Sequence, residues 1–139
     1  MDEVFLDTSF CVDLLREQAR DVAGAASAAL SSLGEEAVCV SVFVACELEA
    51  GACLSHNAQK ERERVEGFLK LVEVVYPDRR FAAAYGAAES RLRSAGTPVP
   101  TMDLLIGVTS LVAGEGILTR DPTHFARIPG LSVVSYASG

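Results

Sequence analysis

Five short apolar segments recur along the chain, and stretches with the apolar spacing of helices separate them. The segments are VFL at 4–6, AVCVS at 37–41, LVEVVYP at 71–77, GILTRD at 116–121 and LSVVSY at 131–136. The first segment has no polar alternation, which is typical of a strand covered on both faces. Short apolar strands that alternate with helices predict a parallel α/β sandwich. At 139 residues the chain has the size of a single domain, 1–139.

The segments between the strands predict helices. We expect them over 10–17, 19–33, 42–48, 56–71, 79–96 and 102–116. Thr8 or Ser9 can cap the first helix and Ser41 the third, because hydroxyl side chains are common at N-caps. The KERER run at 60–64 is interpreted as a charge-paired, exposed face of the fourth helix rather than a binding patch.

Composition excludes several classes of protein. Half of the residues are hydrophobic, which argues against disorder. No apolar run approaches the ~18–20 residues that span a bilayer, and the start MDEVFLD is acidic where a signal peptide is basic. We therefore expect a cytoplasmic protein that does not enter the membrane. The four cysteines form no Cys-x-x-Cys pair and are expected to be small core residues; they are Cys11, Cys39, Cys46 and Cys53.

The net charge of −7 at first disfavours a nucleic-acid partner. The charge is uneven, however: residues 1–75 hold 14 acidic and 6 basic side chains, and residues 76–139 hold 5 and 6. The second half includes six scattered arginines. This distribution permits a polyanionic substrate without pointing to one.

Asp7 stands directly after the first apolar segment, in VFLDTSF. Open parallel α/β sheets place their ligands at the carboxyl ends of strands, so this carboxylate can belong to a site. It can equally belong to the helix cap or the turn, since Asp is common just before helices.

Three more acids have similar surroundings. Glu47, in VACELEAG, has apolar or small neighbours one turn away on its helix. Asp103 enters the first turn of the most hydrophobic helix, where the helix dipole alone would favour a carboxylate. Asp121 follows GILT and repeats the placement of Asp7. Each acid has an ordinary explanation as a cap, a turn residue or a solvated helix face.

Crowded carboxylates repel one another unless a positive group neutralises them. A divalent cation is the natural choice, and hard Mg²⁺ or Mn²⁺ prefers carboxylate oxygens. His56 and His124 lie far apart in the sequence and suggest no zinc site, so each is interpreted as structural. A cation held by carboxylates with open water positions suits phosphodiester hydrolysis.

Four motifs resemble the PIN domain, and more narrowly the VapC-type toxins of toxin–antitoxin pairs. They are FLDTSF near the start, ELEAG on a helix, and PVPTMDLLIG and ILTRDPTHF late in the chain. The resemblance covers nearly the whole length and implies an α/β/α sandwich on a mainly parallel sheet. It also implies a Mg²⁺-dependent endoribonuclease, with Mn²⁺ able to substitute, and an antitoxin protein as partner.

The resemblance assigns roles to particular residues. The family's acids correspond to Asp7, Glu47, Asp103 and Asp121, with Asp7 and Asp103 as the main metal ligands and the other two secondary or acting through water. Thr119 corresponds to a hydroxyl that supports the first aspartate, and Thr8 and Ser9 are further supporting residues. One departure is His124, which stands where many relatives have an acid before Phe125. A homodimer is expected as well, because a chain this apolar should leave some helix surface to be covered.

Two other interpretations stay open. FLDTS could contain a phosphoryl-accepting aspartate, as in haloacid-dehalogenase-like phosphatases, but that chemistry usually needs a second Asp two residues later, where this chain has Ser9. Alternatively, the chain could be a non-catalytic PIN-like module that only binds RNA or a protein. Retention of all four acids argues against such a module, because a negative pocket does not favour a polyanion.

Overall fold

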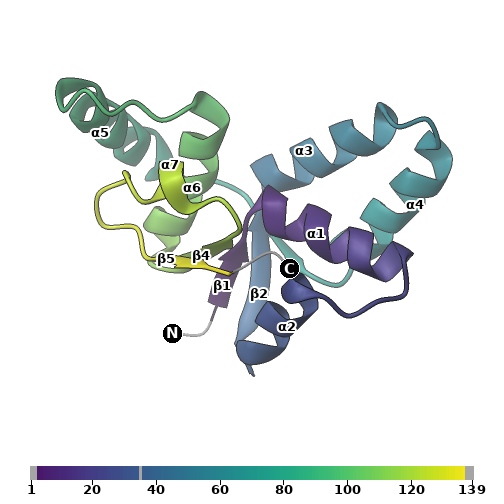
Figure 1. Ribbon diagram of the computed structural model, residues 1–139. Helices are drawn as coiled ribbons and strands as arrows, with labels where there is room; N and C mark the ends of the chain where they lie inside the picture. Colours follow the sequence, from purple (N-terminus) through teal and green to yellow (C-terminus); the bar gives the residue numbers. More distant parts are fainter. Residues whose placement is uncertain (1–2, 35, 137–139) are drawn as a thin grey trace.

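The computed structural model describes residues 3–34 and 36–136 and contains one parallel sheet. Within these residues the sheet has five strands in the order β3-β2-β1-β4-β5, all parallel (Figure 1). The strands are β1 (Glu3–Leu6), β2 (Ala37–Ser41), β3 (Glu73–Val75), β4 (Gly116–Thr119) and β5 (Val133–Ser135). The predicted parallel α/β architecture is therefore confirmed.

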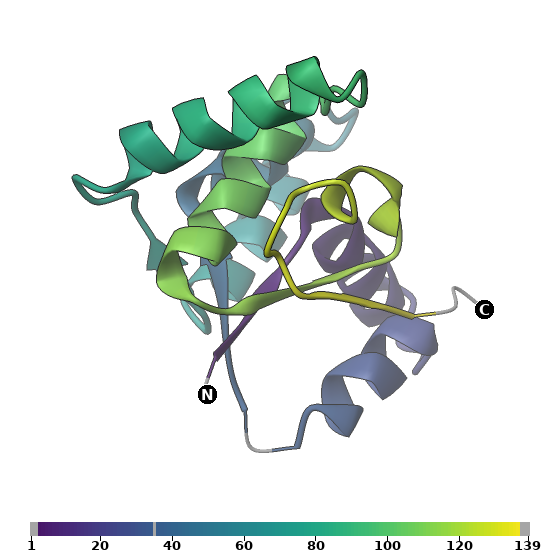
Figure 2. The same cartoon turned by 90° about the vertical axis from the view of Figure 1, so that its left-hand side faces the viewer.

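Helices cover both faces of the sheet. They are α1 (Thr8–Ala19), α2 (Ala25–Ser32), α3 (Val42–Cys53), α4 (Ala58–Leu69), α5 (Phe81–Ser94), α6 (Thr101–Ala113) and the short α7 (Pro122–Phe125). Two perpendicular views show α1 to α4 on one face of the sheet and α5 to α7 on the other (Figures 1 and 2). This arrangement is the α/β/α sandwich that the resemblance implied. None of the helices in the described segments is both long and apolar enough to cross a membrane.

Helix α1 begins two residues earlier than predicted, and its N-cap is Asp7 rather than Thr8 or Ser9. Thr8 and Ser9 lie inside the first turn rather than at the cap, and their hydroxyls donate to the carboxylates of Glu47 and Asp7. Ser41 does cap α3, since its Oγ accepts the backbone N–H of Val44 at 3.2 Å. The predicted helix 19–33 was too long, because α2 begins only at Ala25.

Glu17 explains where α2 begins. The carboxylate of Glu17 accepts backbone N–H groups of Gly24, Ala26 and Ser27, each at 2.9 Å, and also the Ser27 hydroxyl. Although partial burial opposes ionisation, these four donors lower the pKa of Glu17 to about 2. A carboxylate from α1 thus satisfies the N–H groups at the start of α2 that have no partner within the helix.

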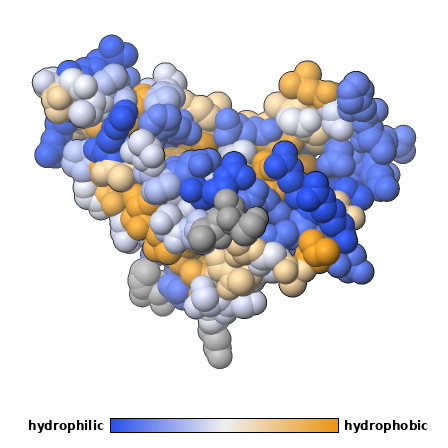
Figure 3. All heavy atoms as spheres, viewed as in Figure 1, coloured by the Kyte–Doolittle hydropathy of each residue, from blue (hydrophilic) through white to orange (hydrophobic). Residues whose placement is uncertain are grey.

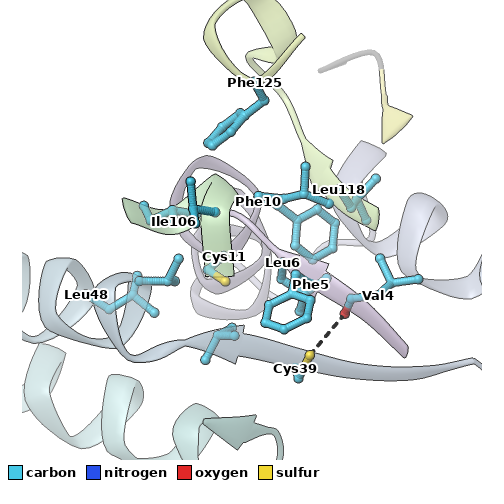
Figure 4. Packing of buried hydrophobic residues seen from close by; sticks show 14 of the residues in the cluster. Val4, Phe5, Leu6, Phe10, Cys11, Cys39, Leu48, Ile106, Leu118 and Phe125 are labelled. Carbon is cyan, nitrogen blue, oxygen red and sulfur yellow. Dashed lines mark hydrogen bonds between the residues drawn. The ribbon is translucent and has the colours of Figure 1, made fainter. Parts of the chain in front are cut away.

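The core lies where the central strands meet the helices on either face (Figure 4). Val4, Phe5 and Leu6 of β1 are all buried, as expected for a strand covered on both sides. Phe10 of α1 packs edge-on against Tyr136, with ring centroids 5.4 Å apart, which ties the end of the described chain to the first helix. Burial of this apolar surface is the main source of stability for the fold.

The prediction that all four cysteines are core residues was half wrong. Cys11 and Cys39 are buried, and Cys39 Sγ donates to the Val4 carbonyl at 3.8 Å. Cys46 and Cys53 are exposed. The inward stripe of α3 is formed by Val44, Leu48 and Ala52 at four-residue spacing, so the two exposed cysteines lie off that stripe.

The KERER run has the predicted character of a solvated, charge-paired face. Arg62 pairs with Glu66 at 3.5 Å, and Arg64 pairs with Glu61 at 3.3 Å, all on α4. Such pairs one turn apart contribute little individually. The buried face of the same helix carries Val65 and Phe68.

Candidate active site

Asp7 and Thr119 lie side by side at the carboxyl edge of the sheet. The backbone N–H of Asp7 donates to the Leu118 carbonyl at 3.0 Å, which continues the pairing of β1 with β4 by one residue. At this point the connections leave the sheet toward opposite faces, and such a switch point is where α/β sheets bind ligands. The space-filling view shows a hollow at this edge, between the two groups of helices (Figure 3).

Two hydroxyls hold the carboxylate of Asp7. Ser9 Oγ donates to Asp7 Oδ2 at 2.9 Å, and Thr119 Oγ1 donates to the same oxygen at 2.8 Å. Each hydroxyl oxygen in turn accepts a backbone N–H, from Arg120 for Ser9 and from Asp121 for Thr119. Both hydroxyl hydrogens are therefore directed at Asp7, and its carboxylate has a fixed orientation.

The side chain of Asp7 is 5% exposed, and it does not cap α1 although it occupies the N-cap position. Its pKa is raised above the ordinary value, chiefly because burial disfavours the charged form. The hydrogen bonds from Thr119, Ser9 and the Thr8 backbone oppose this rise, and the negative charge of Asp103 adds to it. A buried carboxylate whose charge is disfavoured in this way is a candidate functional group, since perturbed pKa values cluster at functional sites.

Glu47 reaches the same region from α3. Its Oε1 accepts the Thr8 hydroxyl at 2.6 Å, and Thr8 follows Asp7 directly in the chain. Thr8 thus links the two acids: its hydroxyl binds Glu47 on α3, and Asp7, its neighbour in the chain, is the N-cap residue of α1. The structure brings Glu47 to the site and shows Thr8 as the residue that positions it.

Asp103 lies in the first turn of α6, as predicted. Its Oδ2 is 2.7 Å from Nδ1 of His124 on α7, and both side chains are partly exposed. The influence of Asp103 on the pKa of Asp7 indicates that the two carboxylates lie within electrostatic range of each other. The direct contact between Asp103 and His124 could not be read from sequence, where His124 was interpreted only as structural.

Asp121 is the exception among the four acids. Its backbone N–H binds Thr119 Oγ1 at 3.0 Å, but its side chain is 69% exposed and its Oδ2 lies 3.4 Å from the Arg120 guanidinium. The structure therefore places the backbone of Asp121 at the site and shows its carboxylate paired with Arg120.

A network beside the site was also missed from sequence. Asp13 on α1 accepts Arg120 Nη1 at 2.7 Å and the Tyr136 hydroxyl at 2.8 Å. This network anchors Arg120, whose backbone N–H donates to Ser9. Tyr136, at the end of the described chain, therefore helps through Asp13 and Arg120 to fix the position of Ser9, which binds Asp7.

The carboxylates fit a cation with few protein ligands. Among the described residues, no three His, Cys, Asp or Glu side chains are grouped closely enough to form a metal site by themselves. Mg²⁺ usually keeps several waters and is held by only one or two carboxylates, unlike zinc in a closed cage. Asp7 and Asp103 supply that donor set, with Glu47 nearby.

Residues 4–131 match the PIN domain family. The chain belongs to the PIN domain family. This finding, together with the relatives described next, confirms the resemblance drawn from its motifs.

Relatives of this PIN domain carry the VapC name. It is 27% identical to the tRNA(fMet)-specific endonuclease VapC of Salmonella typhimurium over 133 residues, 96% of this chain and 97% of the relative. It is 30% identical to ribonuclease VapC19 of Mycobacterium tuberculosis over 126 residues, 91% and 94% of the two chains. The structure resembles a chain of DNA-bound VapBC from Salmonella typhimurium, with a TM-score of 0.83 and 27% identity over 97% of this chain and 98% of that one.

Proposed function

We propose that this PIN domain is the toxin of a toxin–antitoxin pair, an endoribonuclease that hydrolyses RNA phosphodiester bonds with the help of Mg²⁺. The VapC relatives are named ribonucleases and endonucleases, which supports the reaction class. The observation that carries the proposal is the hydroxyl-held, buried Asp7, whose charge is disfavoured by burial and by Asp103.

Asp7 and Asp103 would hold the cation, with Glu47 acting directly or through water. A bound divalent cation would lower the pKa of an attacking water and would neutralise negative charge on the phosphate. The protein contributes the arrangement of its acids: Ser9 and Thr119 orient Asp7, and Thr8 orients Glu47. We assign Asp121 a secondary role through water, since its carboxylate is paired with Arg120.

The choice of cation tests this proposal. We expect the purified chain to cleave RNA with Mg²⁺ or Mn²⁺ and to work poorly with Ca²⁺, whose larger and looser coordination shell would misplace the water. Cleavage should stop in EDTA and return when Mg²⁺ is added in excess. The measurement is RNA cleavage by gel, with Asp7→Asn as the inactive control.

Equal cleavage in EDTA would overturn the metal-dependent mechanism. If the chain neither binds a divalent cation at millimolar concentration nor cleaves RNA, it is instead a binding module. In cells, sequencing of the RNA ends produced on induction, compared with Asp7→Asn, would identify the target.

An antitoxin is the proposed protein partner. The solved Salmonella relative is a VapBC assembly bound to DNA, which supports a partner of this kind. We propose that the antitoxin covers the acidic hollow and inserts an Arg or Lys, because a basic side chain can replace the charge of the cation.

We also propose that the chain forms a homodimer. The apolar side chains of Leu54, Leu71 and Tyr76 are strongly exposed, and such surfaces often mark interfaces. Light scattering at tens of micromolar should give twice the mass of the chain. A strict monomer at that concentration would contradict the dimer.

A further inference from the structure

His124 makes a direct contact with an acid of the site although it comes from a separate short helix. Its Nδ1 lies 2.7 Å from Asp103 Oδ2. An ionised carboxylate only accepts hydrogen bonds, so Nδ1 must carry the hydrogen in this contact. The bond occupies Oδ2 of Asp103, and it fixes the plane in which the other oxygen, Oδ1, is presented.

The helix that carries His124 is firmly anchored. Phe125, the residue after His124, and Ile128, just beyond the helix, are almost fully buried. They pack on α6 at Gly107, where an added Cβ would overlap the end of Ile128 and crowd Phe125. Gly107 lies one turn after Asp103 on the same helix. The imidazole and the carboxylate are therefore held at a fixed separation by the packing of α7 on α6.

Such an arrangement is how proteins orient metal ligands. Side chains that hydrogen-bond to a ligand fix its orientation, and their loss typically weakens metal binding by about 10–100-fold. We propose that His124 is a positioning residue that orients Asp103 for the divalent cation. This inference rests on the proposed metal-dependent function. In this positioning role, His124 acts through Asp103 and does not need to contact the cation, the substrate or the reacting water.

The opposite role is competition: a protonated imidazole would occupy the place of the cation beside Asp103. The two roles predict effects of opposite sign. Removing the imidazole weakens cation binding if His124 orients Asp103, and strengthens it if His124 competes.

The experiment measures binding of Mn²⁺ alone, from the electron paramagnetic resonance signal of the free ion, at one fixed pH. His124→Leu removes the donor and should weaken Mn²⁺ binding by about 10–100-fold. His124→Asn keeps an amide N–H near the position of Nδ1 and should restore most of the affinity. His56→Leu is the matched control, because His56 is an exposed histidine in a turn, 68 positions before His124 in the sequence. The Mn²⁺ affinity of this variant should equal that of the wild type.

Asp103→Asn separates failure of the inference from failure of the proposed function. If the wild type binds Mn²⁺ and Asp103→Asn does not, but His124→Leu binds like the wild type or more tightly, the positioning role is overturned and the metal site stands. An equal loss of Mn²⁺ affinity in His124→Asn and His124→Leu also overturns the positioning role, because the N–H donor of Asn would then fail to restore binding. If the wild type binds no Mn²⁺, or Asp103→Asn binds normally, both proposals fall.

Discussion

Asp103→Asn should reduce RNA cleavage by orders of magnitude, while the melting temperature measured in EDTA stays the same or rises. The loss of activity is expected because a main ligand of the cation that activates water is removed. The stability result follows from repulsion: the charge of Asp103 helps to raise the pKa of buried Asp7, which makes ionised Asp7 costly at neutral pH. Removing that charge lowers the cost in the metal-free protein.

The ordinary role of Asp103 predicts the reverse on both counts. As a first-turn acid favoured only by the helix dipole, its replacement by Asn would cost about 0.3–1 kcal/mol and leave cleavage intact. The side-chain oxygen of Asn can still accept the His124 N–H, so loss of that hydrogen bond should not obscure the comparison.

Asp78→Asn is a suitable control, because Asp78 is an exposed acid that pairs with Arg80 just before α5. It removes one negative charge from the chain outside the proposed site, and RNA cleavage should be unchanged. A variant Asp103→Asn that melts lower yet cleaves normally would make Asp103 a helix-terminal acid, and the proposed site would be wrong.

The sheet could be predicted from sequence because its strands are short, apolar and separated by helical spacing. The signal is strongest for β1, where three consecutive buried residues run into a carboxylate. The end of a strand also fixes where its next side chain lies, so the sequence alone was enough to place Asp7 at the carboxyl edge of the sheet. Thr119 could be placed beside it only through the family resemblance.

Side-chain direction was less predictable. Asp121 follows its strand as Asp7 does, but its carboxylate turns to Arg120, which is itself held by Asp13 from α1. The contact between Asp103 and His124 depends on how α7 packs on α6, and α7 has only four residues, too few for a periodic signal. The exposure of Cys46 and Cys53 depends on which face of α3 turns inward, and a small residue such as cysteine can occupy either face.

Phe125 is the buried residue on which the position of α7 depends. Its side chain is 2% exposed and points from α7 into the core (Figure 4). It packs against α6 at Gly107, which has no side chain to fill a gap left by a smaller residue at position 125. Truncation there should therefore leave a cavity rather than a collapsed contact.

We expect Phe125→Ala to lower the free energy of unfolding by about 3–5 kcal/mol, because it loses both the buried area of the ring and the contacts that line the cavity. Urea denaturation followed by circular dichroism measures this change. Val22→Ala is the control, since Val22 is an exposed apolar residue outside the proposed dimer surface and its truncation should change stability by no more than about 0.5 kcal/mol. A loss for Phe125→Ala as small as that of the control would show that α7 does not depend on this side chain for its position, and the anchoring of His124 would need another explanation.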